Sequence, residues 1–491
     1  MAPAVFSGKW PTKFSGGLLS LVSFFIFLIL DFIDALFCMI YGILDECFEG
    51  EASLCFCRKR KELLDDGEDE QSETLYSRKN VFKEISFLGY SSKRGDSKKR
   101  GSGLMVNRWS DCGCESCASW MKNGDQKLHV IVREPSKGIN NSLGHSLSKA
   151  RLIWYMAWEA LRAGIYLSVR WVHSGGPAGL DYFVARFASW GSVMNLHIRW
   201  AKPADNVIFL HGFLCSSSFW TETVFPNLSE TIYQNYRLFA VDLLGFGKSP
   251  KPRDCSYTLK NHVEAIEKSV ICPFGLGSFH LVAHSMGCVV ALALAAKYSN
   301  SVKSITFVSP PYFPASKEGG SLVALKKLAG KRLWPPLLFA SSVMSWYEHL
   351  GRCVCFLICR HHRTWEEILK LLTGRRDLHF MIVDLTRHTH QSAWHTMHNV
   401  ICGGAKVLDG FLVVLVNAGL KICVIHGDRD PVVPIECIAT IKMRAPDTEV
   451  HIIRNADHAS VVLGREKEFA LYLGRVWTSV ADIASNEECS K

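Results

Sequence analysis

The sequence has no module in which basic and aromatic residues are interleaved, although its formal net charge is +10. Much of the excess basic charge lies in short runs such as "RKRK" (58–61) and "KKR" (98–100), which are typical of solvated linkers. A nucleic-acid-binding protein would carry a recognisable recognition module. The sequence therefore predicts no nucleic-acid partner.

The sequence also lacks the cysteine pattern of a two-knuckle zinc site. Its 18 cysteines fall short of the density of a disulfide scaffold. Cys112, Cys114 and Cys117 lie together in "WSDCGCESCASW", but no second C-x-x-C pair supplies a fourth ligand. Disulfides are favoured there over a zinc site or free thiols. The cap histidines (His388, His390, His395 and His398) have no acidic neighbour to complete a catalytic metal set, so neither a metal nor a cofactor is expected.

Long apolar runs are present at the N-terminus, at 17–30 and 35–44, and two aspartates separate them. We interpret residues 1–47 as a signal peptide or signal anchor. Because carboxylates are costly at a bilayer centre, a cleaved or lipid-modified signal is as consistent with the pattern as a spanning helix. Cys47 follows the apolar run and is a candidate for acylation, but "ILDEC" lacks the small residues of a lipoprotein cleavage site.

Two segments between the N-terminus and the regular part of the chain are predicted to lie outside the core. Residues 48–126 have the composition of a charged linker followed by the Cys-rich segment. Residues 138–200 are an atypical insertion. Within it, 151–172 has helical spacing with charges inside, which favours an amphipathic helix over a membrane span.

From residue 206 onward, short apolar runs rich in β-branched residues alternate with helical stretches. They predict strands at 206–210, 238–245, 279–285, 302–310 and 420–428, after a first strand at 127–135. This alternation predicts a mostly parallel, doubly wound α/β sheet. Residues 315–405 interrupt it with helical sequence, where an inserted helical cap is expected. The core then comprises 127–314 and 406–485, and 486–491 form a tail.

One serine stands between a predicted strand and a helix, in Ala283-His284-Ser285-Met286-Gly287. Small residues two before and two after it permit the strained turn of a nucleophile elbow, with alanine here in place of the usual first glycine. The alternative is an ordinary serine at a helix start. A dehalogenase or soluble epoxide hydrolase would have an aspartate nucleophile at this position, so Ser285 excludes both.

Two residues follow later strands in the order that an α/β-hydrolase requires. Asp430 lies after the strand at 420–428 and is preferred over Asp428, which can brace the turn. His458 follows a strand at 449–454. In this triad Ser285 attacks an acyl carbon, His458 transfers the proton, and Asp430 fixes the imidazole tautomer.

The segment "VIFLHGF" (207–213) ends a strand in His211-Gly212, followed by Phe213. The backbone N–H after the glycine is expected to face a developing oxyanion together with the N–H of Met286. A plain glycine turn is the alternative. The predicted oxyanion and substrate residues are therefore His211, Gly212, Phe213 and Met286.

Long segments of the chain resemble the BODYGUARD family of plant epidermal α/β-hydrolases. They are "RWSDCGCESCASW", "HGFLCSSSFWTETVF", "HLVAHSMGCVVALALAAKYS", "SPPYFPA", "HTHQSAWHTMHNVICGGAKV" and "NADHASVVLGREKEFALYL". The resemblance implies a lysophospholipase-like serine hydrolase of carboxylic esters that acts on a lipid-like acyl ester and serves cuticle development. By position it implies Ser285, Asp430 and His458 as the triad, with His211 and Phe213 at the oxyanion loop.

The resemblance also implies a place in the secretory pathway, at the plasma membrane (with a lipid anchor as one form) or in the cell wall, through the N-terminal segment. Two alternatives stay open. An acyltransferase, such as a cutin synthase, would use the same triad, and a wall protein with this fold could be non-catalytic.

Overall fold

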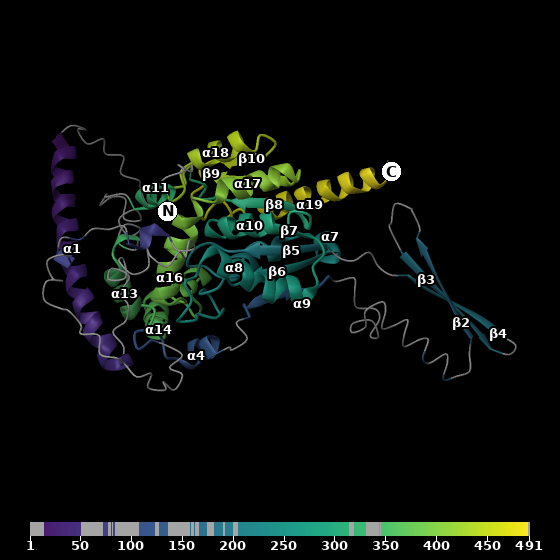
Figure 1. Ribbon diagram of the computed structural model, residues 1–491, viewed down its shortest axis with the longest axis horizontal. Coiled ribbons are helices and arrows are strands. Elements are labelled where there is room, and N and C mark those ends of the chain that lie inside the picture. The colour runs from purple at the N-terminus through teal and green to yellow at the C-terminus, as the bar shows by residue number, and fades with distance from the viewer. Residues whose placement is uncertain are drawn as a thin grey trace, which may run out of the picture.

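The computed structural model describes residues 14–50, 72–76, 80, 82–83, 108–122, 127–135, 158, 162, 166–173, 181–189, 192–199, 205–313, 319–329, 343 and 345–489. A seven-stranded sheet forms its centre, in the order β1-β6-β5-β7-β8-β9-β10 (Figure 1). Every neighbouring pair is parallel except β1 with β6. The strands are β1 (Val130–Arg133), β5 (Asp205–Leu210), β6 (Tyr236–Val241), β7 (Phe279–His284), β8 (Val302–Val308), β9 (Lys421–Gly427) and β10 (Glu449–Ile453).

The strands are apolar throughout because both faces of the sheet are covered. In β5, Ile208 and Leu210 belong to the core on one face, whereas Val207 and Phe209 belong to the core on the other. This period of two follows from the alternation of side chains along a strand. All six residues of β7 are buried. The prediction of an α/β-hydrolase fold with a mostly parallel sheet is confirmed.

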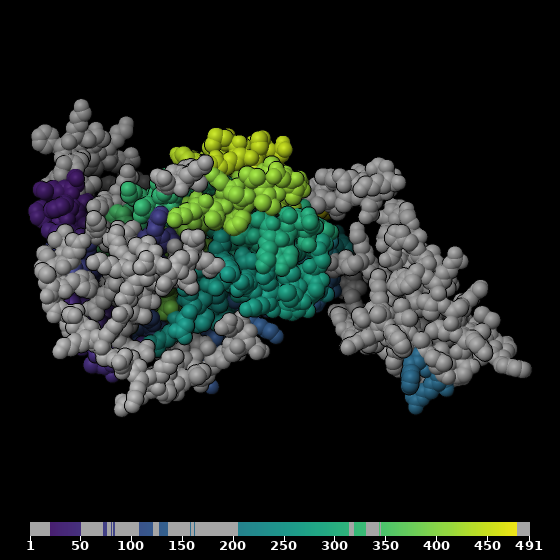
Figure 2. All heavy atoms as spheres, viewed as in Figure 1, coloured from purple at the N-terminus to yellow at the C-terminus, as the bar shows by residue number. Residues whose placement is uncertain are grey.

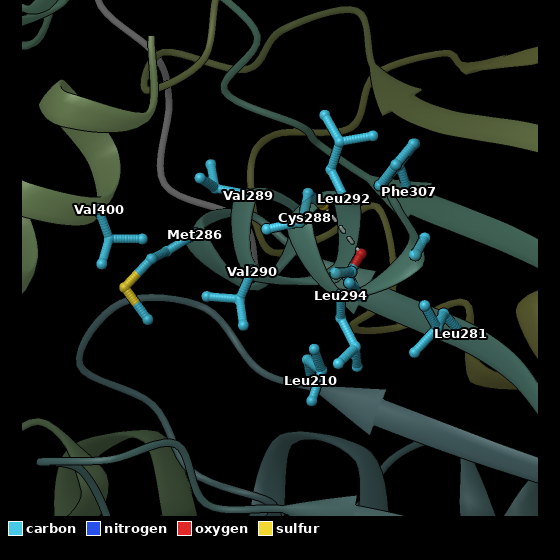
Figure 3. Close-up of a cluster of buried hydrophobic side chains, with 14 of the residues drawn as sticks. Leu210, Leu281, Met286, Cys288, Val289, Val290, Leu292, Leu294, Phe307 and Val400 are labelled. Carbon is cyan, nitrogen blue, oxygen red and sulfur yellow. Dashed lines mark hydrogen bonds between the residues drawn. The ribbon is translucent and has the colours of Figure 1, made fainter. Parts of the chain in front are cut away.

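Helix α10 (Met286–Lys297) starts directly after β7, and its residues are buried from Met286 to Ala295. Figure 3 shows its side chains pointing outward on several sides, toward Leu210, Phe307 and Val400. The other helices of the core are α6 (Ser218–Thr221), η3 (Phe225–Asn227), α7 (Glu230–Asn235), α8 (Leu259–Ile266), η4 (Glu267–Ile271), α9 (Cys272–Phe274), α17 (Leu408–Asn417), α18 (Glu436–Arg444) and α19 (Glu466–Cys489).

Between β8 and β9 the described chain is helical, and this helical region is called the cap below. Its helices are α11 (Gly320–Leu328), α13 (Glu348–Leu357), α14 (His362–Thr373), α15 (Phe380–Asp384), α16 (His390–Thr396) and η5 (Met397–Cys402). The long helix α1 (Phe14–Glu49) runs beside α13 (Figure 1). Short elements η1 (Glu73–Tyr76) and α4 (Glu115–Lys122) follow it in the chain.

The predicted charged linker contains a short part that packs on the body. The Ser72 backbone N–H donates to Asn399 Oδ1 at 2.9 Å, and Thr74 Oγ1 lies 2.8 Å from His398 Nδ1. Both Ser72 and Thr74 are buried. The linker interpretation is therefore wrong for this turn, because polar residues can be buried where hydrogen bonds satisfy them.

The predicted helix over 151–172 is wrong at its C-terminal end. Residues 166–173 form β2 (Tyr166–His173), which pairs antiparallel with β3 (Asp181–Ser189). β3 pairs in turn with β4 (Ser192–Arg199), and this small sheet lies apart from the core in Figure 1. The sequence "YLSVRWV" alternates leucine, valine and tryptophan with other residues at a period of two, which suits a strand better than a helix.

The predicted disulfides are absent among the cysteines whose side chains the structure describes, because none of these is joined to another cysteine. They include the three cysteines at 112, 114 and 117.

Candidate active site

Ser285 occupies a strained turn between β7 and α10. Its φ is +51° and its ψ is −122°, a conformation that a residue with a side chain rarely adopts. The turn is held by the Ser285 backbone N–H, which donates to the Val308 carbonyl at 2.8 Å. A Cβ at Gly287 would lie 2.6 Å from the His211 carbonyl oxygen and 2.8 Å from that of Leu210. Only glycine fits there, which explains the last position of the pentapeptide.

The structure brings Ser285, His458 and Asp430 into one line of hydrogen bonds. His458 Nε2 lies 2.8 Å from Ser285 Oγ, and His458 Nδ1 lies 2.7 Å from Asp430 Oδ2. Asp430 is separated from Ser285 by 145 positions and from His458 by 28, so the fold alone creates this proximity. A carboxylate, an imidazole and a hydroxyl in this order can activate the hydroxyl as a nucleophile.

Asp430 is oriented by the backbone of its own loop. Its Oδ1 accepts hydrogen bonds from the N–H groups of Val432 and Val433, at 2.8 and 2.9 Å, which leaves Oδ2 for His458. Burial by itself raises the pKa of this carboxyl, but the hydrogen bond and charge of His458 and the two backbone donors bring the pKa below its usual value. Asp428 is exposed, and the structure does not place it in this line.

The loops that carry Asp430 and His458 lie in close contact. A Cβ at Gly427 would approach the Ala456 carbonyl oxygen to 2.3 Å, so the end of β9 can lie against residues 455–457 only as glycine. Asn455 turns the chain with φ +56°. Asp457 Oδ1 then accepts from the Ala459 and Ser460 N–H groups at 3.0 and 2.7 Å. These contacts fix the loop that presents His458.

The segment 211–213 lies against the nucleophile turn. A Cβ at Gly212 would be 3.2 Å from Ser285 Cβ, so this backbone passes directly beside the serine. His211 Nε2 accepts from the Leu243 N–H at 2.9 Å, and its Nδ1–H therefore donates to the Gly212 carbonyl at 2.7 Å. Burial lowers the pKa of His211, so the ring is neutral and positions the loop.

Met286 is the first residue of α10, and the first N–H groups of a helix have no partner within it. Its side chain is buried in the core. Phe213 packs edge-to-face on Phe246, with ring centroids 5.7 Å apart. The structure thus places His211, Gly212 and Met286 against the same turn, and Phe213 follows Gly212 in the chain.

Two positioning residues were missed from the sequence. His284 donates from Nε2 to the His458 carbonyl at 2.9 Å and stacks on Phe219 at a centroid distance of 4.7 Å. Burial lowers its pKa to about 3, so it stays neutral. Asp384 of the cap accepts from Ser216 Oγ at 2.7 Å and ties the cap to the loop that follows Gly212. His284 occupies a variable position of the pentapeptide, and no sequence pattern marks Asp384.

The chain is similar to several known proteins. Residues 205–333 match a family described as "alpha/beta hydrolase fold". The chain is 46% identical to "Probable lysophospholipase BODYGUARD 4" of Arabidopsis thaliana over 479 residues, which cover 96% of this chain and 100% of that protein. It is 44% identical to "Probable lysophospholipase BODYGUARD 5" of the same plant, over 98% of each chain. A solved haloalkane dehalogenase variant, DbeA-M1 from Bradyrhizobium elkanii, is 17% identical with a TM-score of 0.43, over 66% of this chain and 99% of that one.

Proposed function

The chain belongs to the BODYGUARD family of α/β-hydrolases and is an ester-bond hydrolase, and on that premise we propose that Ser285, His458 and Asp430 are its catalytic triad. The observation that carries the proposal is the line of two hydrogen bonds, 2.7 and 2.8 Å, from Asp430 through His458 to Ser285. Such a line is the arrangement that nucleophilic acyl transfer needs.

In the first half-reaction, Ser285 Oγ attacks the ester carbonyl carbon while His458 Nε2 takes its proton. The oxyanion of the tetrahedral intermediate accepts hydrogen bonds from the Phe213 and Met286 N–H groups. His458 returns the proton to the departing alkoxide, which leaves as an alcohol and yields the acyl-enzyme. Water then attacks with the same proton transfers and releases the carboxylic acid. Asp430 keeps the His458 proton on Nδ1 and stabilises the imidazolium that forms in each half.

The substrate class in this proposal is a lipid acyl ester, in particular a lysophospholipid. The relatives named as probable lysophospholipases support it, because they align over nearly the whole chain. The family resemblance extends the proposal to cuticle development, at the plasma membrane or in the epidermal wall. An acyltransferase differs only in the acceptor, since an alcohol would attack the same acyl-enzyme in place of water.

We further propose that α1 is retained and lies along a membrane surface. Its residues Ser20–Glu49 are long and apolar enough to cross a membrane. However, Asp34 accepts from the His349 and Leu350 N–H groups at 3.0 and 3.1 Å, at the start of α13. Asp45 forms a bidentate pair with Arg352 at 2.6 and 2.7 Å. Cleavage before residue 45 would remove this partner of Arg352 and uncover the face of α13 on which α1 packs.

The opposite face of α1 is apolar and exposed, as shown by Phe24, Phe25, Ile29 and Phe32, each more than half exposed. The helix lies at one end of the molecule in Figure 2. An apolar face of this kind buries itself at the boundary between headgroups and acyl chains. The mass of the mature protein from a plant secretory host tests retention. Cleavage before residue 45 would contradict retention of α1. Contact of α1 with a membrane has its own test: the double variant Phe25→Asp, Ile29→Asp should float less with phosphatidylcholine vesicles than the unsubstituted protein.

An assay of ester hydrolysis by the full-length protein in detergent tests the catalytic proposal. The protein should be incubated with monoacylglycerols, lysophospholipids and hydroxy-acyl esters, with and without alcohol acceptors. We expect free fatty acid from a lysophospholipid, and about a million-fold less from Ser285→Ala, the matched control. Acyl transfer to the alcohol instead of to water would assign the acyltransferase. Equal turnover by Ser285→Ala, or no turnover of any ester by folded protein, would contradict a catalytic triad.

A further inference from the structure

A cluster of metal-ligating side chains lies outside the candidate active site, where the Cys-rich segment meets the cap. Cys112 and Cys114 come just before α4, Cys117 lies in the first turn of α4, and His362 is the first residue of α14. Figure 1 shows α4 near α14. The four ligand atoms, three Sγ and one imidazole nitrogen, all lie within 4.8 Å of one another. Cys117 and His362 are buried.

The distances within the cluster match tetrahedral coordination. His362 Nε2 lies 3.5 Å from Cys114 Sγ and 3.4 Å from Cys117 Sγ. Around a tetrahedral zinc ion, with Zn–S about 2.3 Å and Zn–N about 2.0 Å, a sulfur and a nitrogen are about 3.5 Å apart. In addition, the Cys114 N–H points to Cys112 Sγ at 3.4 Å, and such N–H groups stabilise thiolate ligands.

A second residue orients the imidazole for metal binding. His362 Nδ1 lies 3.1 Å from Glu366 Oε1, one helical turn further along α14. The carboxylate accepts the Nδ1 proton, so the lone pair of Nε2 points toward the three sulfurs. Metal-ligating histidines usually have such a carboxylate or carbonyl partner on the other ring nitrogen. Arg387 Nη2 lies 3.9 Å from the same oxygen, Glu366 Oε1, and adds a positive charge beside the carboxylate.

A disulfide explains this cluster less well. It would use two of the three sulfurs and would leave the third sulfur and the buried imidazole without a role. Three thiolates and one imidazole are instead a set that selects zinc among the common divalent metals. Since all four positions are occupied by protein atoms, no position is left for water or substrate, which is the property of a structural rather than a catalytic zinc site.

We propose that Cys112, Cys114, Cys117 and His362 bind one structural zinc ion. The ion fastens the segment 108–122 to the cap. The same segment contacts α1, because Trp109 Nε1 donates to Asp45 Oδ1 at 2.6 Å, and it contacts α13, because Arg352 lies over the Trp109 ring at 5.5 Å. The zinc site therefore joins the N-terminal helix to the cap through this segment. The expectation of no metal site is revised, because His362 supplies the fourth ligand from 245 positions beyond Cys117.

The described residues include a second cluster of possible metal ligands, so zinc at the Cys112 site must be measured as the difference in zinc content between variants. Cys355 Sγ and Cys359 Sγ lie 3.4 and 3.6 Å from His388 Nε2, and these three side chains are buried. They offer three ligands to any additional ion. The total zinc content of the chain can thus exceed one, whereas the loss caused by a substitution isolates the Cys112 site.

The test measures zinc in the full-length protein, purified in detergent, by inductively coupled plasma mass spectrometry. Cys117→Ser and His362→Gln should each contain one zinc ion per chain fewer than the unsubstituted protein. Cys272→Ser, which removes an exposed thiol outside both clusters, should contain the same amount. X-ray absorption spectra at the zinc edge should be recorded for the unsubstituted protein and for Cys117→Ser. The difference between the two spectra should show three sulfur ligands and one nitrogen ligand.

Glu366→Gln provides a second test that keeps all four ligands. We expect zinc affinity to fall about 10- to 100-fold, since the loss of such a partner has that effect, and a competing chelator reports it. Circular dichroism confirms that the variants are folded. Unchanged zinc in Cys117→Ser and His362→Gln, or a disulfide among the three cysteines found by mass spectrometry of the alkylated protein, would overturn the proposal.

Discussion

Asp430→Asn separates the geometry of the proposed triad from its chemistry. The asparagine oxygen should take the place of Oδ1, because the Val432 and Val433 N–H groups require an acceptor there. The amide nitrogen then occupies the place of Oδ2, 2.7 Å from His458 Nδ1. It can only donate. The imidazole must therefore carry its proton on Nε2, where it can no longer accept the proton of the Ser285 hydroxyl.

The expected loss follows from this exchange of tautomers. A triad whose histidine is held in the wrong tautomer loses about 10⁴ in kcat. This loss corresponds to about 5.5 kcal/mol of transition-state stabilisation. The fold should be retained, because the side chain keeps its volume and its two backbone hydrogen bonds. Asp428→Asn changes an exposed carboxylate in the same loop and should leave kcat within about twofold, as surface substitutions usually have small effects.

The assay is steady-state hydrolysis of a short p-nitrophenyl ester by the protein in detergent, with kcat and KM determined separately. We expect kcat to fall and KM to change little, since Asp430 does not contact substrate. A near-normal kcat for Asp430→Asn would refute the role of Asp430. A large loss for Asp428→Asn with normal activity of Asp430→Asn would reassign the acidic residue.

Three further predictions concern stability and are measured by thermal unfolding in detergent. Gly287→Ala should destabilise the fold by about 3 kcal/mol, because the added methyl group meets two backbone carbonyl oxygens. The control Gly410→Ala has open space around the added methyl group within a helix and should stabilise the fold by up to about 1 kcal/mol. Equal effects of the two substitutions would argue against the close contact at the nucleophile turn. Burial raises the pKa of Asp384 to about 6, above that of the unfolded chain, so the folded state binds this proton more tightly and stability should fall by up to about 3 kcal/mol as the pH rises from 4 to 6. Asp384→Asn should lack this contribution, so the difference in stability between the two proteins should change by up to about 3 kcal/mol over this pH range, and a constant difference would contradict the assignment to Asp384. Asp45→Ala leaves Arg352 buried without its partner and should lower the free energy of unfolding by about 3–5 kcal/mol. The double variant with Arg352→Met should recover most of this loss. No loss of stability in the single variant would show that α1 does not pack on the cap.

The strands were the most predictable part of the molecule. Both faces of the central sheet are covered, so apolar runs such as 279–284 have no other stable place than the core. The three proposed triad residues follow three of these strands, and the common edge of a parallel sheet brings them together. The order of the residues and the strand ends were visible in the sequence, and the packing of the loops was not.

The parts that escaped prediction depend on contacts between distant segments. His362 ends a stretch rich in cysteine and histidine at 353–362, but nothing in the sequence pairs it with the three distant cysteines, and only the fold places it beside them. In the sequence, the aspartates of α1 argue against a membrane-spanning helix. In the structure, Asp34 accepts hydrogen bonds from the start of α13, and Asp45 pairs with Arg352. At 151–172 the helical and strand periods compete over a short window, and pairing with β3 decides for a strand at 166–172.

Labelling with a fluorophosphonate probe tests the account most directly, because the probe forms an adduct only with an activated serine. Tryptic mass spectrometry of the labelled, folded protein should find one adduct, on Ser285, and the adduct should vanish in His458→Ala. An unlabelled Ser285 in folded protein, or undiminished labelling without His458, would contradict the claim that the imidazole activates this hydroxyl.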